Sequence, residues 1–239
     1  MGGSFCRSEV FVDLGDSMID WRAIDTVLLD MDGTLLDLHF DSHFWLEHLP
    51  RRYVELHQLG EAERLALRER IIGEQGTLNW YSLKYWSLEL NVDIVALKRE
   101  VQHLIGLRGD ALDFLNWLRK AHPRVVLATN ADRASLDLKL PLTGLDDYLD
   151  AIVSSADVGE PKEEQAFWHA LQQIEPFDPE RTLFIDDNPH VLESARQFGI
   201  RHLLGIRQPD SQRPERELID FTALDRFADI LPPEETRHG

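Results

Sequence analysis

TVLLDMDGT, residues 26–34, is a short run of apolar residues that ends in a turn of Asp, Gly and Thr. Such a run, closed by turn residues, is typical of a buried strand that leads into a loop. Similar apolar runs recur at 124–129, 151–154, 181–186 and 200–206. Helical patterns separate the later runs, at 163–174 and 190–198. Strands that alternate with helices predict an α/β fold, a doubly wound parallel sheet covered by helices on both faces.

One long interval interrupts this alternation, because its apolar residues fall at helical spacing between glycines. We therefore predict an inserted all-helical segment, called the cap below. The terminal segments are polar and rich in Gly, Ser, Asp or Pro, so we expect them to be weakly ordered. The predicted division of the chain is an extension at 1–20, an α/β core at 21–39 and 107–230, the cap at 40–106, and a tail at 231–239.

The composition is acidic: 25 Lys and Arg stand against 43 Asp and Glu, which gives a formal net charge of −18 and a pI near 4.9. Such a surface repels phosphate backbones and anionic lipid, so we expect neither a nucleic-acid nor a membrane partner. The single cysteine, Cys6, excludes an internal disulfide and fits a cytoplasmic location. No apolar run approaches the roughly 18 residues of a spanning helix. The oligomeric state stays open.

Polar side chains follow the predicted strands, at the edge where an open α/β sheet binds ligands. They are Asp30, Asp32, Thr129, Asn130, Lys162, Asp186 and Asp187. Four carboxylates in one crevice would be driven toward protonation unless positive charge is supplied. With one lysine among them and only oxygen ligands, the pattern predicts Mg²⁺. A metal, an ammonium group and the Thr and Asn donors together predict a site that handles phosphate.

The spacing of Asp30 and Asp32 suggests a reaction, because carboxylates two residues apart at a strand end can both point into the crevice. One can attack phosphorus, forming an aspartyl-phosphate, while the other handles protons. Asp32 is suited to protonate the leaving alkoxide and then to deprotonate water. Gly33 permits the tight turn that brings the backbone near the phosphate. An acid at position 32 favours phosphate esters over carbon–halogen bonds, which need no proton on an oxygen leaving group.

These motifs in this order, DMDGT with a following LLD, then Thr-Asn, then a Lys, then a strand-ending Asp-Asp, resemble the haloacid-dehalogenase-like hydrolase superfamily. The resemblance implies that Asp30 is the nucleophile and Asp32 the acid/base. It further implies that Thr129, Asn130 and Lys162 bind the phosphate. The order Pro-Lys at the lysine motif departs from the Lys-Pro of many relatives, which shifts only the loop.

The same resemblance implies the metal ligands. They are Asp30, the backbone oxygen of Asp32, and the pair Asp186 and Asp187. The commoner Gly-Asp form of the last motif places its acid at the position of Asp187. We therefore expect Asp187 to bind Mg²⁺ directly and Asp186 to act through water.

The position of the insert, between the first and second motifs, is similar to the branch of that superfamily with a helical cap. HFDSHFWLEHLP (39–50), TLNWYSLKYWSLEL (77–90), GEPKEEQAFWHAL (159–171) and RTLFIDD (181–187) resemble the bacterial GMP/IMP nucleotidase group. This likeness implies a Mg²⁺-dependent 5′-nucleotidase that dephosphorylates GMP and IMP. Within the cap we expect Asn79, Tyr81 and Lys84 to contact the substrate, although packing explains most of the aromatic residues there.

Two alternatives stay open. The first is a phosphatase or mutase of the same mechanism that acts on phosphoglycolate or a sugar phosphate, because only the cap separates these substrates. The second is a non-catalytic, Mg²⁺-binding phospho-switch, since receiver domains also gather an acidic pair, an Asp, a Thr and a Lys. In receivers, however, the acidic pair comes first in the chain and there is no helical insert.

Overall fold

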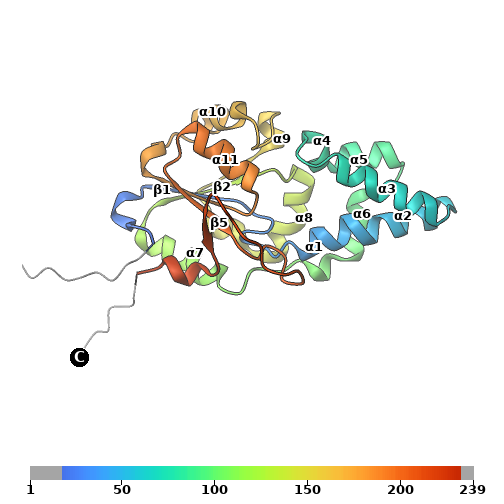
Figure 1. Cartoon of the computed structure of the whole chain (residues 1–239), viewed down its shortest axis with the longest axis horizontal. Coiled ribbons are helices and arrows are strands. Elements are labelled where there is room, and N and C mark those ends of the chain that lie inside the picture. The colour runs from blue at the N-terminus through green and yellow to red at the C-terminus, as the bar shows by residue number, and fades with distance from the viewer. Residues whose placement is uncertain (1–17, 233–239) are drawn as a thin grey trace, which may run out of the picture.

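Six parallel strands form the sheet of this computed structural model, which describes residues 18–232 (Figure 1). Every pairing is parallel, in the order β3-β2-β1-β4-β5-β6. The predicted fold class is therefore confirmed. The strands are β1 (Thr26–Leu29), β2 (Arg124–Thr129), β3 (Ala151–Ser154), β4 (Thr182–Asp186), β5 (His202–Ile206) and β6 (Thr222–Leu224).

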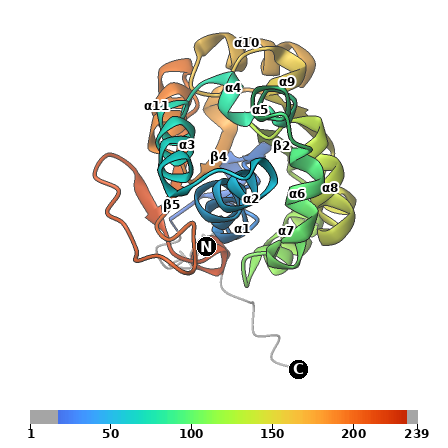
Figure 2. The same ribbon diagram turned by 90° about the vertical axis from the view of Figure 1, so that its right-hand side faces the viewer.

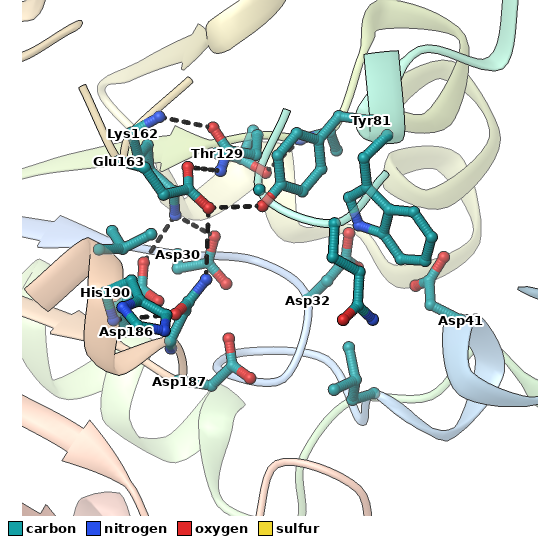
Figure 3. Close-up of a pocket in the computed structure, with 18 of the residues that line it drawn as sticks. Asp30, Asp32, Asp41, Tyr81, Thr129, Lys162, Glu163, Asp186, Asp187 and His190 are labelled. Carbon is teal, nitrogen blue, oxygen red and sulfur yellow. Dashed lines mark hydrogen bonds and ion pairs between the residues drawn. The ribbon is translucent and has the colours of Figure 1, made fainter. Parts of the chain in front are cut away.

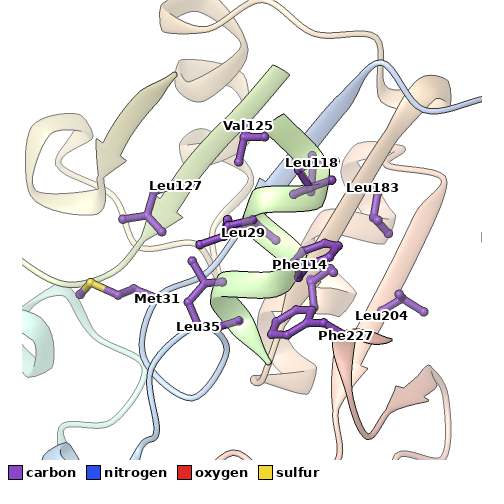
Figure 4. Packing of buried hydrophobic residues seen from close by; sticks show 14 of the residues in the cluster. Leu29, Met31, Leu35, Phe114, Leu118, Val125, Leu127, Leu183, Leu204 and Phe227 are labelled. Atoms are coloured by element: carbon purple, nitrogen blue, oxygen red, sulfur yellow. The ribbon is translucent and has the colours of Figure 1, made fainter. Parts of the chain in front are cut away.

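Helices cover both faces of this sheet. Successive side chains of a strand point to opposite sides, so a strand made of apolar residues needs apolar partners on both faces. Leu29 faces the cluster that contains Phe114 of α7, as Figure 4 shows. Leu28 belongs to the opposite cluster, with Trp168 and Leu192. The helices that flank the sheet are α7 (Ala111–Ala121), α8 (Arg133–Thr143), α9 (Ser155–Val158), α10 (Gln165–Ile174) and α11 (Pro189–Phe198).

A second group of helices lies between β1 and β2 in sequence and beyond one end of the sheet in space (Figures 1 and 2). It has its own apolar cluster, which includes Phe40, Phe44, Trp86 and Ile94, and Leu138 of α8 joins it. The helices are α1 (His39–His43), α2 (Leu49–His57), α3 (Glu61–Gly73), α4 (Leu78–Tyr81), α5 (Leu83–Leu90) and α6 (Ile94–Glu100). Apart from His39, the first residue of α1, these elements fall in the interval predicted to be the cap, and the proposed boundaries at 40 and 106 stay a prediction.

Short side chains set where the small cap helices begin. Thr77, Ser82 and Asp93 accept hydrogen bonds from backbone N–H groups in the first turns of α4, α5 and α6. These N–H groups have no partner inside the helix, so the caps stabilise each start. Asp132 of the core accepts a further bond from the backbone of Leu83, at 2.7 Å, and so ties α5 to the start of α8.

A turn of π-helix joins α1 to α2, so that the chain from 39 to 57 is continuously helical. The N–H of Leu49 bonds to the carbonyl of Phe44, five residues earlier. Pro50 follows directly and has no N–H to donate, which explains the local widening.

Single turns of 3₁₀-helix complete the fold, and they connect or end the larger elements. They are Trp21–Ala23, Gln102–Leu104, Leu145–Tyr148, Pro179–Arg181 and Phe227–Ile230. Of the predicted extension, residues 1–17 lie outside the described residues, while Ile19 is buried in the core. Of the predicted tail, 233–239 likewise lie outside them. Within 18–232, none of the helices has the length and apolarity that crossing a lipid bilayer requires.

Candidate active site

The carboxyl ends of the central strands bring the predicted catalytic residues together. β1 pairs with β2 on one side and β4 on the other, so Asp30 lies between the ends of both neighbours. Asp186 is the last residue of β4, and Asp187 follows it. Figure 3 shows Asp30, Lys162, Asp186 and Asp187 converging on one cavity. The strand register thus brings together side chains that lie more than 150 positions apart in the chain.

Lys162 is the buried cation of this cluster. Its Nζ lies 2.5 Å from Oδ1 of Asp30, 2.6 Å from Oδ2 of Asp186 and 3.0 Å from the carbonyl of Ala128. Burial alone would lower the pKa of Lys162, but the carboxylates of Asp186 and Asp30 outweigh it and raise the pKa above its usual value. The side chain therefore stays charged and holds the two acids close together.

Asp30 and Asp32 both have raised pKa values. Burial raises the pKa of Asp30 to about 6, helped by the charge of Asp186 and opposed by Lys162. Burial also raises the pKa of Asp32 to about 6, helped by Asp41 and opposed by Lys139. Lys139 donates to Oδ1 of Asp32 at 2.6 Å. The two acids thus have separate lysine partners.

Three carboxylates form a site that fits a metal ion. One oxygen each from Asp30, Asp186 and Asp187 lies within 4.8 Å of the others. Burial and the charges of Asp186 and Asp30 raise the pKa of Asp187 well above its usual value, and the Arg216 guanidinium stands 3.8 Å away. Asp30 and Asp186 are buried and share Lys162, whereas Asp187 is partly buried beside Arg216. Three carboxylates against two cations leave negative charge uncompensated, and their oxygen ligands suit Mg²⁺.

The two aspartates of the final motif differ in their surroundings. Asp186 accepts from Lys162 through Oδ2 and from the backbone N–H of Asn188 through Oδ1, so both oxygens already have partners. The Asp187 carboxyl packs against Gly33, where a Cβ atom would lie only 2.8 Å from its Cγ. Gly33 also has a φ of +88°, which L side chains rarely adopt. Glycine at this turn therefore leaves the space that Asp187 occupies.

Thr129 and Asn130, the predicted phosphate binders, line the same cavity as Asp30. The Thr129 hydroxyl accepts from the backbone of Ala131 at 3.0 Å. Asn130 accepts from the backbone N–H of Lys162 at 2.9 Å and donates to Glu163 at 2.9 Å. This network fixes the orientation of the Asn130 amide in the cavity that Asp30 also lines.

The three cap residues predicted to contact substrate lie in different places. Tyr81 lines the cavity, and its hydroxyl donates to Glu163 at 2.8 Å (Figure 3). Burial and the Glu163 carboxylate raise the pKa of the Tyr81 phenol far above its usual value. Asn79 and Lys84 are exposed and do not line this cavity.

Sequence reasoning missed several charged residues of the site. Glu163 links Asn130 to Tyr81, and Lys139 joins Asp32 to Asp41 of α1. Glu163 lies in the GEPKEEQAFWHAL stretch (159–171), but that resemblance gave it no role. For Lys139 a weak signal exists, because lysine is rare in this chain and leucines stand on either side of it.

A cavity of about 810 Å³ extends from the carboxylates at the strand ends to the cap. On the cap side its wall includes Trp45, Gln75 and Trp80. The rings of Trp45 and Trp80 have centroids 5.6 Å apart. The volume lies in the range of sites for small organic molecules, with polar groups gathered at one end and aromatic rings at the other.

Residues 24–199 match the family model described as haloacid dehalogenase-like hydrolase. The chain belongs to this family and is a hydrolase. It is also 41% identical over 215 residues to the GMP/IMP nucleotidase YrfG of Escherichia coli (strain K12), a match that covers 90% of this chain and 97% of that protein. Identity to the pyrophosphatase PpaX of Bacillus mycoides (strain KBAB4) is 21% over 229 residues, 87% of this chain and 96% of PpaX.

Solved structures share the fold. An HAD phosphatase from Thermococcus onnurineus superposes with a TM-score of 0.72 at 20% identity, over 87% of this chain and 96% of the other. A putative beta-phosphoglucomutase from Thermotoga maritima gives 0.62 at 20% identity, with the same coverage of both chains. At this identity the likeness concerns the architecture of core and helical insert alone.

Proposed function

We propose that this hydrolase is a Mg²⁺-dependent phosphomonoesterase that works through an aspartyl-phosphate and acts on purine 5′-mononucleotides, GMP and IMP. The observation that carries the substrate is the 41% identity to the GMP/IMP nucleotidase over 97% of its length. The observation that supports the reaction is the convergence of Asp30, Asp32 and Lys162 at one edge of the sheet.

In the first half-reaction, an oxygen of Asp30 attacks phosphorus in line with the leaving 5′-oxygen of the ribose. Lys162 holds the Asp30 carboxylate and offsets negative charge near the phosphoryl group. Thr129 and Asn130 donate to its oxygens. Asp32, in its acid form, protonates the departing alkoxide. The nucleoside leaves, and the phosphoryl group stays on Asp30.

In the second half-reaction, Asp32 takes a proton from water, which attacks the phosphoryl group and frees Asp30. The cap excludes other water while this occurs. We assign the metal to the carboxylates of Asp30 and Asp187 and the backbone oxygen of Asp32, with Asp186 acting through water. Mg²⁺ bound there would neutralise charge on the phosphoryl oxygens.

The cavity supports a nucleotide in shape and lining. The aromatic side chains of Trp45 and Trp80 offer an apolar wall for a purine base, while the carboxylate end takes the phosphate. Tyr81 lines the same cavity, and its hydroxyl donates to Glu163, which supports a contact with the substrate.

Phosphate release with Mg²⁺ across a panel of esters tests the proposal. The panel contains GMP, IMP, AMP, pyrimidine mononucleotides, phosphoglycolate and several sugar phosphates. We expect kcat/KM for GMP and IMP to exceed that for the others. Preference for phosphoglycolate or a sugar phosphate would keep the mechanism and overturn the substrate. No release from any ester would favour the non-catalytic phospho-switch.

A further inference from the structure

A row of alternating charges, with both of its lysines buried, runs from the acid/base Asp32 into the cap. Lys139 of α8 donates to Oδ1 of Asp32 and to Oδ2 of Asp41, both at 2.6 Å. Lys98 of α6 donates to the other oxygen of Asp41, at 2.7 Å. The Lys139 and Lys98 side chains are only 1% and 2% exposed. In Figure 3, Asp32 and Asp41 lie on the side of the cavity away from Asp186.

This row of charges joins four elements, of which α6 carries Lys98. Asp32 follows β1, Lys139 is on α8, and Asp41 is on α1. Lys98 is fixed from the far side, because its Nζ stands 4.9 Å and 5.0 Å from the ring centroids of Phe40 and Phe44. Both oxygens of Asp41 are therefore held by lysines, and neither lysine touches Asp30 or Asp186.

Folding stability alone does not require charges at this place, although removing one of them leaves its partner unpaired. Buried ion pairs are often no more stabilising than apolar residues of the same volume, because each charge loses its hydration. The Nζ atoms of Lys98 and Lys139 stand 4.9 Å and 5.3 Å from the ring centroid of Phe40, so apolar side chains would also find an apolar neighbour there. The proposed reaction gives neither lysine a part. The row of charges fixes one oxygen of Asp32.

An acid acts only within hydrogen-bond reach of the atom it protonates, and a small misplacement costs a large factor in rate. Asp32 lies in the loop after β1 and lines the cavity with its side chain partly exposed, so a partner is needed to hold it in one rotamer. Lys139 supplies it through Oδ1, which leaves Oδ2 for the leaving-group oxygen.

We propose that Lys139, held in turn by Asp41 of the cap, is a positioning residue that orients Asp32 for proton donation to the leaving group. The inference rests on the proposed phosphomonoesterase function. It makes correct placement of the acid depend on contact between α8 and the first cap helix.

The test compares two leaving groups in Lys139→Met. The first substrate is the alkyl phosphate that the wild type cleaves best in the panel, whose alkoxide needs a proton. The second is 4-nitrophenyl phosphate, whose phenolate departs without one. Because kcat/KM reports steps only up to formation of the aspartyl-phosphate, it isolates the acid role. We expect a loss of about 10²-fold for the alkyl ester and less than about threefold for the aryl ester.

Lys98→Met is the matched control. It removes an equally buried lysine from the same row of charges, but one that does not touch Asp32. Its ratio of kcat/KM for the two esters should stay within about threefold of the wild-type ratio. Asp41→Asn keeps Lys139 but weakens the contact that holds its ammonium group. We expect kcat/KM for the alkyl ester to fall selectively, by about tenfold. This variant also tests the inference if Lys139→Met does not fold.

A double-mutant cycle separates action through Asp32 from direct substrate contact. In an Asp32→Asn background, Lys139→Met should change kcat/KM for the alkyl ester by less than about threefold. Equal losses for both esters, or a full loss in the Asp32→Asn background, would overturn the role of Lys139. A wild type that cleaves neither ester would instead refute the proposed function, and the inference with it.

Discussion

At the scale of single residues, the site depends on how closely the backbone approaches Asp187, one of the proposed metal ligands. Gly33 touches Asp187 where any Cβ atom would collide, and the same loop carries Asp32. The Arg216 guanidinium lies near the Asp187 carboxylate and donates to the backbone carbonyl of the same residue. The position of Asp187 is thus set by one small residue and one arginine.

Gly33→Ala should therefore weaken Mg²⁺ binding. The added methyl group presses on the Asp187 carboxylate, and the φ of +88° strains any L residue. We expect the Mg²⁺ concentration for half-maximal phosphate release to rise about tenfold or more, in line with the effect of lost support around metal ligands.

Gly199→Ala provides the control. Gly199 has a φ of +109°, but no neighbour lies within 4 Å of the position that a Cβ atom would take. It should lower the unfolding temperature through backbone strain and leave the Mg²⁺ requirement unchanged. The same Mg²⁺ requirement in both variants would show that Gly33 gives no room to Asp187.

Residues of the site differ in how far the sequence could reveal them. Asp30, Asp32 and Asp187 follow apolar strand runs, so pattern and spacing place them at one sheet edge. Lys139 and Glu163 lie in or near helices, where polar side chains are usually solvated, and apart from the scarcity of lysine nothing local indicates that they turn inward. Their partners lie far away in sequence, so only the packing of the elements brings them to the site.

At the scale of the elements, the contact between α1, α6 and α8 depends on the charge of Asp41. Burial alone would raise its pKa, but Lys139 and Lys98 outweigh burial and hold it at about 2, below the ordinary 3.8. A carboxyl whose pKa is lowered by folding stabilises the fold above its ordinary pKa, and this contribution is lost as the pH falls toward the folded value. Asp32 is the other carboxyl group that contacts these lysines, and its partner is Lys139.

Asp41→Asn should consequently be destabilising in a pH-dependent way. At pH 7 we expect the free energy of unfolding to fall by at least about 2 kcal/mol, which corresponds to the lowered pKa. Urea titrations from about pH 6 to about pH 3 should show the difference from wild type narrowing below about pH 4. Asp113→Asn, on the exposed face of α7, is the control with no difference at any pH. A constant gap for Asp41→Asn would contradict a charged, stabilising Asp41.

The arrangement of elements was predictable in the core and less so in the cap. Apolar runs such as 182–186 are buried on both faces, so composition alone identifies them as strands. The π turn before Pro50, and the way α1 meets α8, depend on side chains far apart in the chain. Helical periodicity indicates that such segments are helices, but it does not say which faces meet.

At the scale of the whole molecule, the net charge of −18 opposes the approach of an anionic nucleotide. Raising the ionic strength from about 10 mM to about 150 mM shortens the screening length from about 30 Å to about 8 Å. We therefore expect kcat/KM for GMP to rise severalfold, while kcat at saturating GMP stays unchanged. A fall in kcat/KM would mean that arginines at the cavity, such as Arg213 and Arg216, outweigh the total charge.

The central claim is that Asp30 carries the phosphoryl group of a purine mononucleotide. The most direct measurement is phosphate release from GMP with Mg²⁺ by the wild type, Asp30→Asn and the exposed control Asp113→Asn, each checked for folding by circular dichroism. We predict turnover in the wild type and the control, and a loss of at least about 10³-fold in Asp30→Asn, because the amide cannot attack phosphorus. Near-normal turnover by a folded Asp30→Asn would contradict the account.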